Sequence, residues 1–181
     1  MFPKAHAVAY VTMAFRVAYY KVHYPKAFYI AYYSVRADDF DSSLMAMGRD
    51  TAKQAMADLL AKKKNGQITP KEENLIPILE ICIEMYARGI NFLPVDLYRS
   101  DAINFLDVPE GILPPLNALP GLGANAAKSI TDARANGKFR TVEDLRQRTG
   151  ATKSIIELLQ QNHCLDDLAE ADQVSLFDTV K

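Results

Sequence analysis

The chain has 181 residues, with 21 Lys and Arg against 22 Asp and Glu, three His, two Cys and no Trp. Its 49% apolar and 24% charged content is that of a soluble globular protein with one domain or two small ones, which excludes disorder as its main state. Cys82 and Cys164 are far apart and form neither a disulfide framework nor a zinc-binding spacing. We therefore expect a cytoplasmic protein without a structural metal.

Charge is unevenly distributed along the chain, although the net charge is −1. Residues 1–37 carry five basic side chains and no carboxylate, and residues 117–165 carry seven basic against four acidic ones. Residues 166–181 hold five acidic side chains and one lysine. Such asymmetry says more about partners than the sum does, and the two basic regions point to nucleic acid.

The N-terminal segment is apolar and rich in tyrosine, and it predicts a helix over 5–22 followed by a second over 25–35. A strand is the alternative for 25–35, because that segment is aromatic and partly β-branched. Lys4, Arg16 and Lys21 interrupt the apolar sequence, so we expect neither a membrane-spanning helix nor a signal peptide. Because this apolar helix begins so close to residue 1, we expect its packing neighbours to lie outside this chain.

The next segment predicts a helix over 43–64 that ends at Asn65-Gly66, after three lysines in its last turn. The sequence DDFDSS before it supplies capping side chains. A further helix is predicted to begin at Thr69-Pro70, with Glu72 completing a capping box.

That further helix is predicted to end at Gly89, while Pro77 either kinks it or marks its real start. Residues 90–98 predict a short strand. The clearest break in composition is the proline-rich stretch 109–120. We expect three parts with the following bounds: 1–98, 99–165 and a flexible tail at 166–181.

Residues 119–130, LPGLGANAAKSI, match the helix-hairpin-helix pattern. Its glycines permit a tight turn and a close approach of the backbone, and the free amides at the start of the next helix favour an anion. A DNA phosphate, bound without reading bases, is the expected ligand, and a plain Gly-Pro turn between two helices is the alternative. The predicted phosphate-binding residues are Gly121, Leu122, Gly123, Ala124, Asn125 and Lys128.

A second copy of the motif follows at 139–161. Thr141 and Asp144 resemble a capping box, residues 148–153 would form the hairpin, and a helix is predicted over 154–161. Thr152 stands where the second glycine belongs, so Thr152 and Lys153 are weaker candidates for phosphate binding. Alternatively, this copy serves mainly to pack against the first.

The acidic tail contains the sequence QVSLF, which has the form of the short peptide with which bacterial DNA-processing proteins bind the sliding clamp. A tail that folds back on the domain is the alternative. The predicted clamp-binding residues are Gln173, Val174, Ser175, Leu176 and Phe177.

Together these segments resemble the C-terminal end of the PolC type of bacterial replicative DNA polymerase III. The likeness rests on KAHA and KVHYP within residues 2–41, VDLYRSDA at 95–102, PPLNALPGLGANAA at 114–127 and QVSLF at 173–177. The resemblance implies a mainly α-helical fold: the end of the polymerase fingers, then a tandem helix-hairpin-helix domain and a disordered tail. It implies three partners: duplex DNA, the sliding clamp and the rest of the polymerase chain, with no membrane.

The resemblance also places the first segment near the incoming nucleotide or the primer–template. The residues concerned are Lys4, His6, Tyr10, Arg16, Lys21 and Tyr33. We expect Tyr19, Tyr20, Tyr29 and Tyr32 in the core instead. In the family, aspartates upstream hold the Mg²⁺ ions of nucleotidyl transfer; Asp38, Asp39 and Asp41 read as a capping loop, so this segment should bind no metal and be inactive alone.

The leading hypothesis is therefore a polymerase segment that binds duplex DNA and attaches to the clamp. A free-standing helix-hairpin-helix accessory module for DNA binding or repair is the second hypothesis. An interaction protein whose hairpin is only structural is the third.

Overall fold

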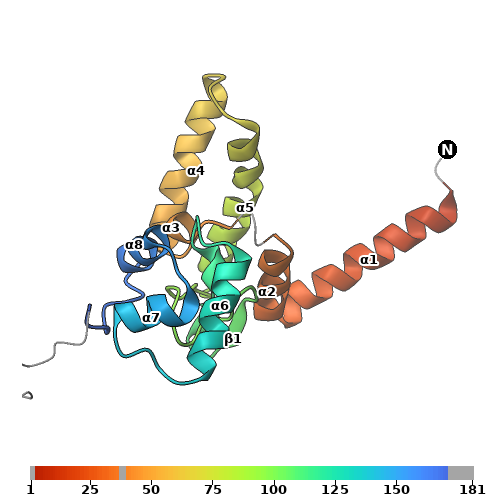
Figure 1. Cartoon of the computed structure of the whole chain (residues 1–181). Coiled ribbons are helices and arrows are strands. Elements are labelled where there is room, and N and C mark those ends of the chain that lie inside the picture. The colour runs from red at the N-terminus through yellow and green to blue at the C-terminus, as the bar shows by residue number, and fades with distance from the viewer. Residues whose placement is uncertain (1–2, 37–39, 171–181) are drawn as a thin grey trace, which may run out of the picture.

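The computed structural model describes residues 3–36 and 40–170. Its fold is mainly α-helical, as predicted, with one small sheet (Figure 1). The helices are α1 (Lys4–His23), α2 (Pro25–Val35), α3 (Ser42–Met45), α4 (Arg49–Lys64), α5 (Pro70–Ala87), α6 (Ala124–Ala135), α7 (Val142–Thr149) and α8 (Lys153–Gln161). The strands are β1 (Leu106–Val108) and β2 (Gly111–Leu113), and a 3₁₀ turn, η2, spans Leu116–Ala118.

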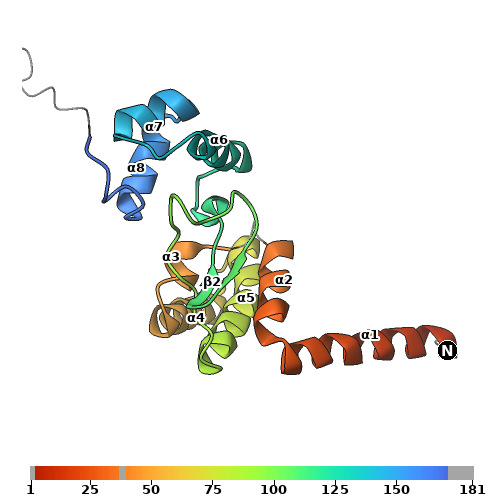
Figure 2. The ribbon, with the colours of Figure 1, turned by 90° about the horizontal axis from the view of Figure 1, so that it is seen from below.

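Helix α1 projects from the body of the molecule and buries none of its residues (Figures 1 and 2). Its root is held by an ion pair of 2.5 Å between Lys21 and Glu84. Arg88 of α5 donates a hydrogen bond of 3.1 Å to the Lys21 carbonyl. Pro25 then begins α2, so the segment 25–35 is a helix and the strand alternative is wrong.

The helix predicted over 43–64 is interrupted, which corrects the sequence-based expectation. Asp41 caps the short α3 by accepting a hydrogen bond of 2.9 Å from the Ser43 amide. Gly48 then adopts φ +99°, a left-handed conformation that a helix cannot contain, and α4 starts after it. The pattern of apolar residues continues across the break, which is why periodicity alone did not reveal it.

Helices α4 and α5 form an antiparallel hairpin that stands out from the body (Figure 1). α4 ends at Asn65 and Gly66, and the predicted capping box between Thr69 and Glu72 is present. α5 runs uninterrupted past Pro77, so this proline does not mark the start of the helix.

Residues 90–98 do not form the predicted strand; within them, only Phe92 makes an isolated bridge, to Ile112. The antiparallel hairpin β1–β2 lies further along the chain, where prolines had indicated only a break. A Cβ atom at Gly111 would lie 2.4 Å from the Asn91 carbonyl oxygen, so only glycine permits this close approach of the two segments.

One hydrophobic core runs through the described chain from α2 onward and includes no residue of α1. Near α2 it contains the rings of Tyr33, Phe40, Phe92 and Phe105, with centroids of neighbouring rings 5.0–6.0 Å apart. The core continues to the packed faces of α6, α7 and α8. The β-hairpin lies between these three helices and the helices of the first half (Figure 2). No helix in the described ranges is long and apolar enough to cross a membrane.

Candidate nucleic-acid interface

The first hairpin (residues 119–123) joins η2 to α6 and is exposed at its glycines. Gly121 has φ +106°, which a residue with a side chain rarely adopts. Gly123 is the N-cap of α6 and has no side chain to satisfy the first amides of that helix. These amides, with the positive end of the helix dipole, are therefore free to bind an anion from solution.

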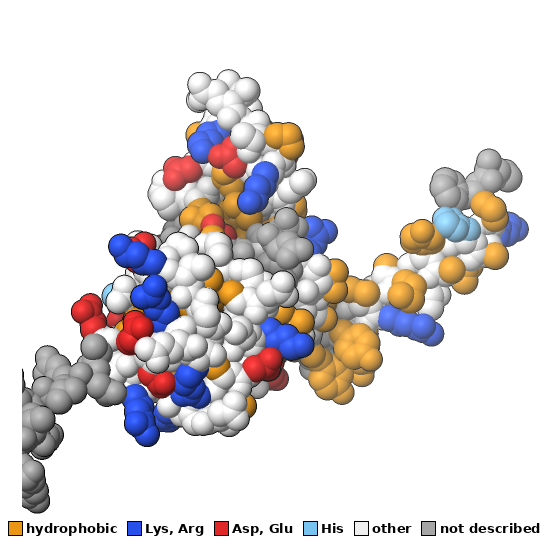
Figure 3. Space-filling model, viewed as in Figure 1, with side chains coloured by type: hydrophobic (Ala, Val, Ile, Leu, Met, Phe, Trp, Pro, Cys, Tyr) orange, Lys and Arg blue, Asp and Glu red, His pale blue; other side chains and the backbone are white. Residues whose placement is uncertain are grey.

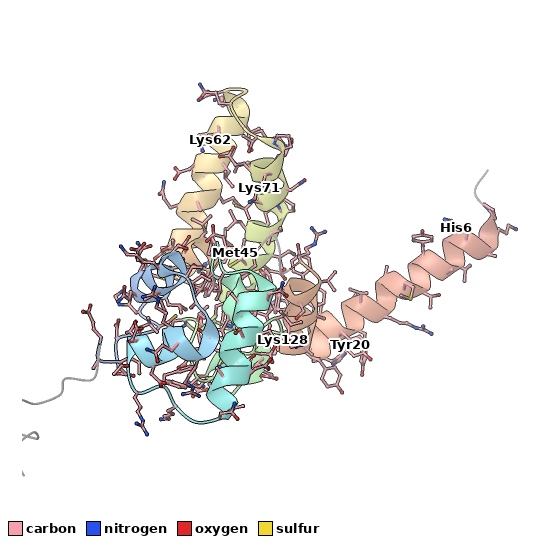
Figure 4. All side chains as sticks on the ribbon, in the orientation of Figure 1. His6, Tyr20, Met45, Lys62, Lys71 and Lys128 are labelled. Atoms are coloured by element: carbon pink, nitrogen blue, oxygen red, sulfur yellow. The ribbon has the colours of Figure 1, made fainter. Side chains whose placement is uncertain are left out.

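Of the residues predicted at this hairpin, Ala124 and Asn125 directly follow Gly123 and are exposed, and Lys128 is exposed further along α6. Lys128 adds a positive charge one turn into the helix (Figure 4). These residues form a surface suited to the oxygens of a phosphate.

Leu122 is different and does not offer a phosphate-binding group. Its side chain is buried, and its amide donates a hydrogen bond of 2.9 Å to the Leu119 carbonyl. Leu122 therefore stabilises the turn by packing into the core. The sequence motif does not distinguish this structural role from direct contact with a phosphate.

The second hairpin (residues 150–152) joins α7 to α8, and the predicted helix over 154–161 is present with one more residue at its start. Gly150 ends α7 in the left-handed conformation. Thr152 caps α8: its hydroxyl accepts a hydrogen bond of 3.4 Å from the Ile155 amide. Thr152 and Lys153 are exposed. However, the Ile155 amide, which a phosphate at the start of α8 would need, is already bonded to the Thr152 hydroxyl.

Two arginines of this region are structural. Arg134 of α6 donates hydrogen bonds of 2.6 Å to the carbonyls of Leu97 and Ser100. Arg148 of α7 donates to the carbonyls of Ala133, Gly137 and Lys138 and lies 4.6 Å from the centroid of the Phe139 ring. These bonds join distant parts of the chain, and the sequence carries no signal that would have identified them.

The two copies of the helix-hairpin-helix motif also contact each other. The Ser129 hydroxyl of α6 donates a hydrogen bond of 2.8 Å to the Thr149 carbonyl, and Leu158 of α8 lies next to Gly121. Lys and Arg side chains are spread over this part of the molecule (Figure 3). The second copy thus packs against the first and supports it.

The candidates for nucleotide contact lie in two different settings. Lys4, His6, Tyr10 and Arg16 are exposed on α1, where the rings of His6 and Tyr10 are 4.4 Å apart (Figure 4). Of the tyrosines expected in the core, Tyr29 is buried and Tyr32 is partly buried, whereas the expectation was wrong for Tyr19 and Tyr20, which are exposed on α1.

Lys21 and Tyr33 do not belong to this exposed set. Lys21 is paired with Glu84 at the root of α1. Tyr33 has 0% of its surface exposed, and burial raises the pKa of its hydroxyl. Neither side chain offers a free surface to a nucleotide in this structure.

The predicted clamp-binding residues 173–177 lie outside the described residues. The described chain ends with a main-chain clasp, which consists of two hydrogen bonds between residues 169–170 and the start of α7. The Val142 amide donates to the Ala169 carbonyl at 2.9 Å, and the Glu143 amide donates to the Glu170 carbonyl at 3.3 Å.

Within residues 3–36 and 40–170, no group of three or more His, Cys, Asp and Glu side chains is placed to hold a metal ion. Asp41 caps α3, in agreement with the interpretation of its segment as a capping loop, and Asp38 and Asp39 lie outside the described residues. The Mg²⁺ ions implied by the resemblance stay a prediction for another part of a polymerase chain.

Residues 89–174 match the family model of the helix-hairpin-helix motif. The chain is 56% identical over 177 residues to the PolC-type DNA polymerase III of Caldanaerobacter subterraneus subsp. tengcongensis. It is 54% identical to that of Clostridium perfringens and 48% identical to that of Bacillus subtilis, over the same length. Each of these matches covers 98% of the chain, and the chain spans 12% of the length of each relative.

Proposed function

We propose that this chain, the counterpart of one segment of PolC-type DNA polymerase III, grips the backbone of duplex DNA at its first hairpin. The observation that supports this function is the uncapped start of α6 behind the exposed Gly121 and Gly123. Amides and Lys128 recognise phosphate oxygens without reading bases, which a polymerase needs because it meets every sequence.

The matched region favours a polymerase segment over a free-standing accessory module. The helix-hairpin-helix motif covers residues 89–174, whereas the likeness to the polymerases also includes α1 to α5. An accessory module would share the motif alone.

Titration of duplex DNA with the whole chain at several salt concentrations tests the phosphate grip. We expect the logarithm of the affinity to fall linearly with the logarithm of the salt concentration, and Gly123→Val to weaken binding about tenfold at low salt. No atom lies within 4 Å of a Cβ at Gly123, and its φ is −67°, so this variant should fold. Absent or salt-independent binding of the wild-type chain would refute the proposal.

We further propose that Lys4, His6, Tyr10 and Arg16 face the nucleotide or primer–template in the complete polymerase. The exposed α1 supports this, since it carries basic and aromatic groups with no carboxylate. The catalytic step needs residues outside this chain, so a primer-extension assay with Mg²⁺ should give no product. Extension by the purified chain would contradict this.

Attachment to the sliding clamp through residues 173–177 is the third part of the proposal. The sequence QVSLF supports it: Gln173 would bond at the rim of a pocket that Leu176 and Phe177 fill. The double variant Leu176→Ala, Phe177→Ala should lose binding to a purified bacterial clamp and keep its affinity for DNA. Normal clamp binding by this variant would exclude the peptide as the attachment site.

A further inference from the structure

A cavity of about 480 Å³ lies beside the first hairpin. One wall is formed by Gly121 and Gly123, and another by Lys71 and Glu72 in the first turn of α5. Asp41, at the start of α3, also lines it. Three helices therefore begin at this cavity.

The three helix starts differ in how their amides are satisfied. The Asp41 carboxylate caps α3, and Thr69 with Glu72 caps α5. α6 has no side-chain cap. An anion in the cavity would complete the third start as internal oxygens already complete the other two.

The lysines at the end of the α4–α5 hairpin are also unequal. Lys62 is bound to Glu72 at 2.6 Å, and Lys63 to Glu73 at 2.8 Å. The hydrogen bond from Lys62 is the main reason why the pKa of Glu72 is lowered to about 2. This carboxylate therefore stays ionised, and its charge is balanced by Lys62. Lys71 lines the cavity, is exposed, and has no ion pair within the described residues (Figure 4).

The charges that face the cavity are thus Lys71, Asp41 and the paired Glu72. The Asp41 carboxylate would repel a phosphate that enters the cavity, and the positive charge of Lys71 would offset this repulsion. Since the phosphates of a DNA strand follow each other in a row, a strand held at the first hairpin brings a neighbouring phosphate toward this second wall.

We infer that Lys71 is a second DNA-backbone contact, which binds the phosphate next to the one held by the first hairpin. This inference rests on the proposed function and extends it across the cavity to α5. It gives the α4–α5 hairpin a role in DNA binding in addition to packing.

The test compares Lys71→Ala with the matched control Lys53→Ala in titrations of duplex DNA between 50 and 200 mM salt. Lys53 is exposed on α4, has no ion pair within the described residues and does not line the cavity. Loss of one phosphate contact should weaken binding several-fold and reduce the slope of log affinity against log salt by about 1. Lys53→Ala should keep the slope of the wild-type chain, and Lys71→Arg should restore most of the affinity.

The charge on the opposite wall gives a second measurement. Asp41→Asn keeps a good helix cap and removes the repulsion, so it should raise affinity about twofold. Equal slopes for Lys71→Ala and Lys53→Ala would overturn this inference and leave the first hairpin as proposed. Salt-independent binding of the wild-type chain would instead remove the proposed function itself.

Discussion

The two hairpins share one motif but differ in what completes the second helix. Gly123 leaves the start of α6 open, whereas the Thr152 hydroxyl bonds to the Ile155 amide at the start of α8. A cap inside the chain stabilises its own helix, while a missing cap leaves the same amides for a ligand. The first hairpin thus leaves amides open where the second satisfies one of its own, in agreement with the proposal that the first binds phosphate and the second supports it.

The largest effect is expected from Gly121→Val in the first hairpin. With φ +106° and a branched side chain, the variant should lose about 1–3 kcal/mol of unfolding free energy and more than tenfold in DNA affinity. Urea unfolding and DNA titration measure the two quantities. A stable variant with normal affinity would show that the turn tolerates another conformation.

Arg148→Ala should weaken the attachment of α7 to α6. Arg148 donates to carbonyls at the end of α6 and just beyond it, so its removal takes away these charged hydrogen bonds and should lower the unfolding free energy by about 2 kcal/mol. Arg140→Ala is the control, because that exposed side chain has no ion pair within the described residues. Equal stability of the two variants in urea would contradict a structural role for Arg148.

Thr152→Val sharpens the contrast with Gly123→Val. Loss of the cap should cost about 1 kcal/mol of stability with little change in DNA affinity. Gly123→Val should cost a similar amount of stability, because glycine is also a better cap than valine, but it should weaken DNA binding about tenfold. If Thr152→Val weakened DNA binding as much as Gly123→Val, the two hairpins would be equal partners in binding.

The smallest effect tests whether the second hairpin can be converted. Thr152→Gly frees the Ile155 amide at a cost of only a few tenths of a kcal/mol, because glycine is a tolerable cap. We expect DNA affinity to rise about twofold, with a matching increase in salt dependence. An unchanged salt slope would indicate that the second hairpin does not reach the DNA.

Features set by local chemistry were predicted well from the sequence. The capping box at Thr69, the ends at Asn65 and Gly89, and the first hairpin depend on residues close together in the chain. The likeness to PolC-type polymerases was predicted from short motifs and is confirmed by the comparisons. The break at Gly48 was missed because the apolar spacing continues across it.

Features that depend on tertiary contacts were not predictable in this way. Lys21 and Arg134 look like free cations in the sequence, but each is held by a partner more than thirty residues away. Tyr33 lies on α2, which packs into the core, and is buried, whereas Tyr20 lies on the projecting α1 and is exposed. The cavity that joins Lys71 to Gly121 requires α5 and the hairpin to be packed together first.

The main-chain clasp has a mechanical consequence. Without the clasp, tension on the residues beyond Glu170 would pass along the chain to the end of α8. The bonds from Val142 and Glu143 take up this load first and transfer it to the start of α7. Since Arg148 couples α7 to α6, a pull on the chain beyond Glu170 would be shared by α6 and α7 before it reached α8.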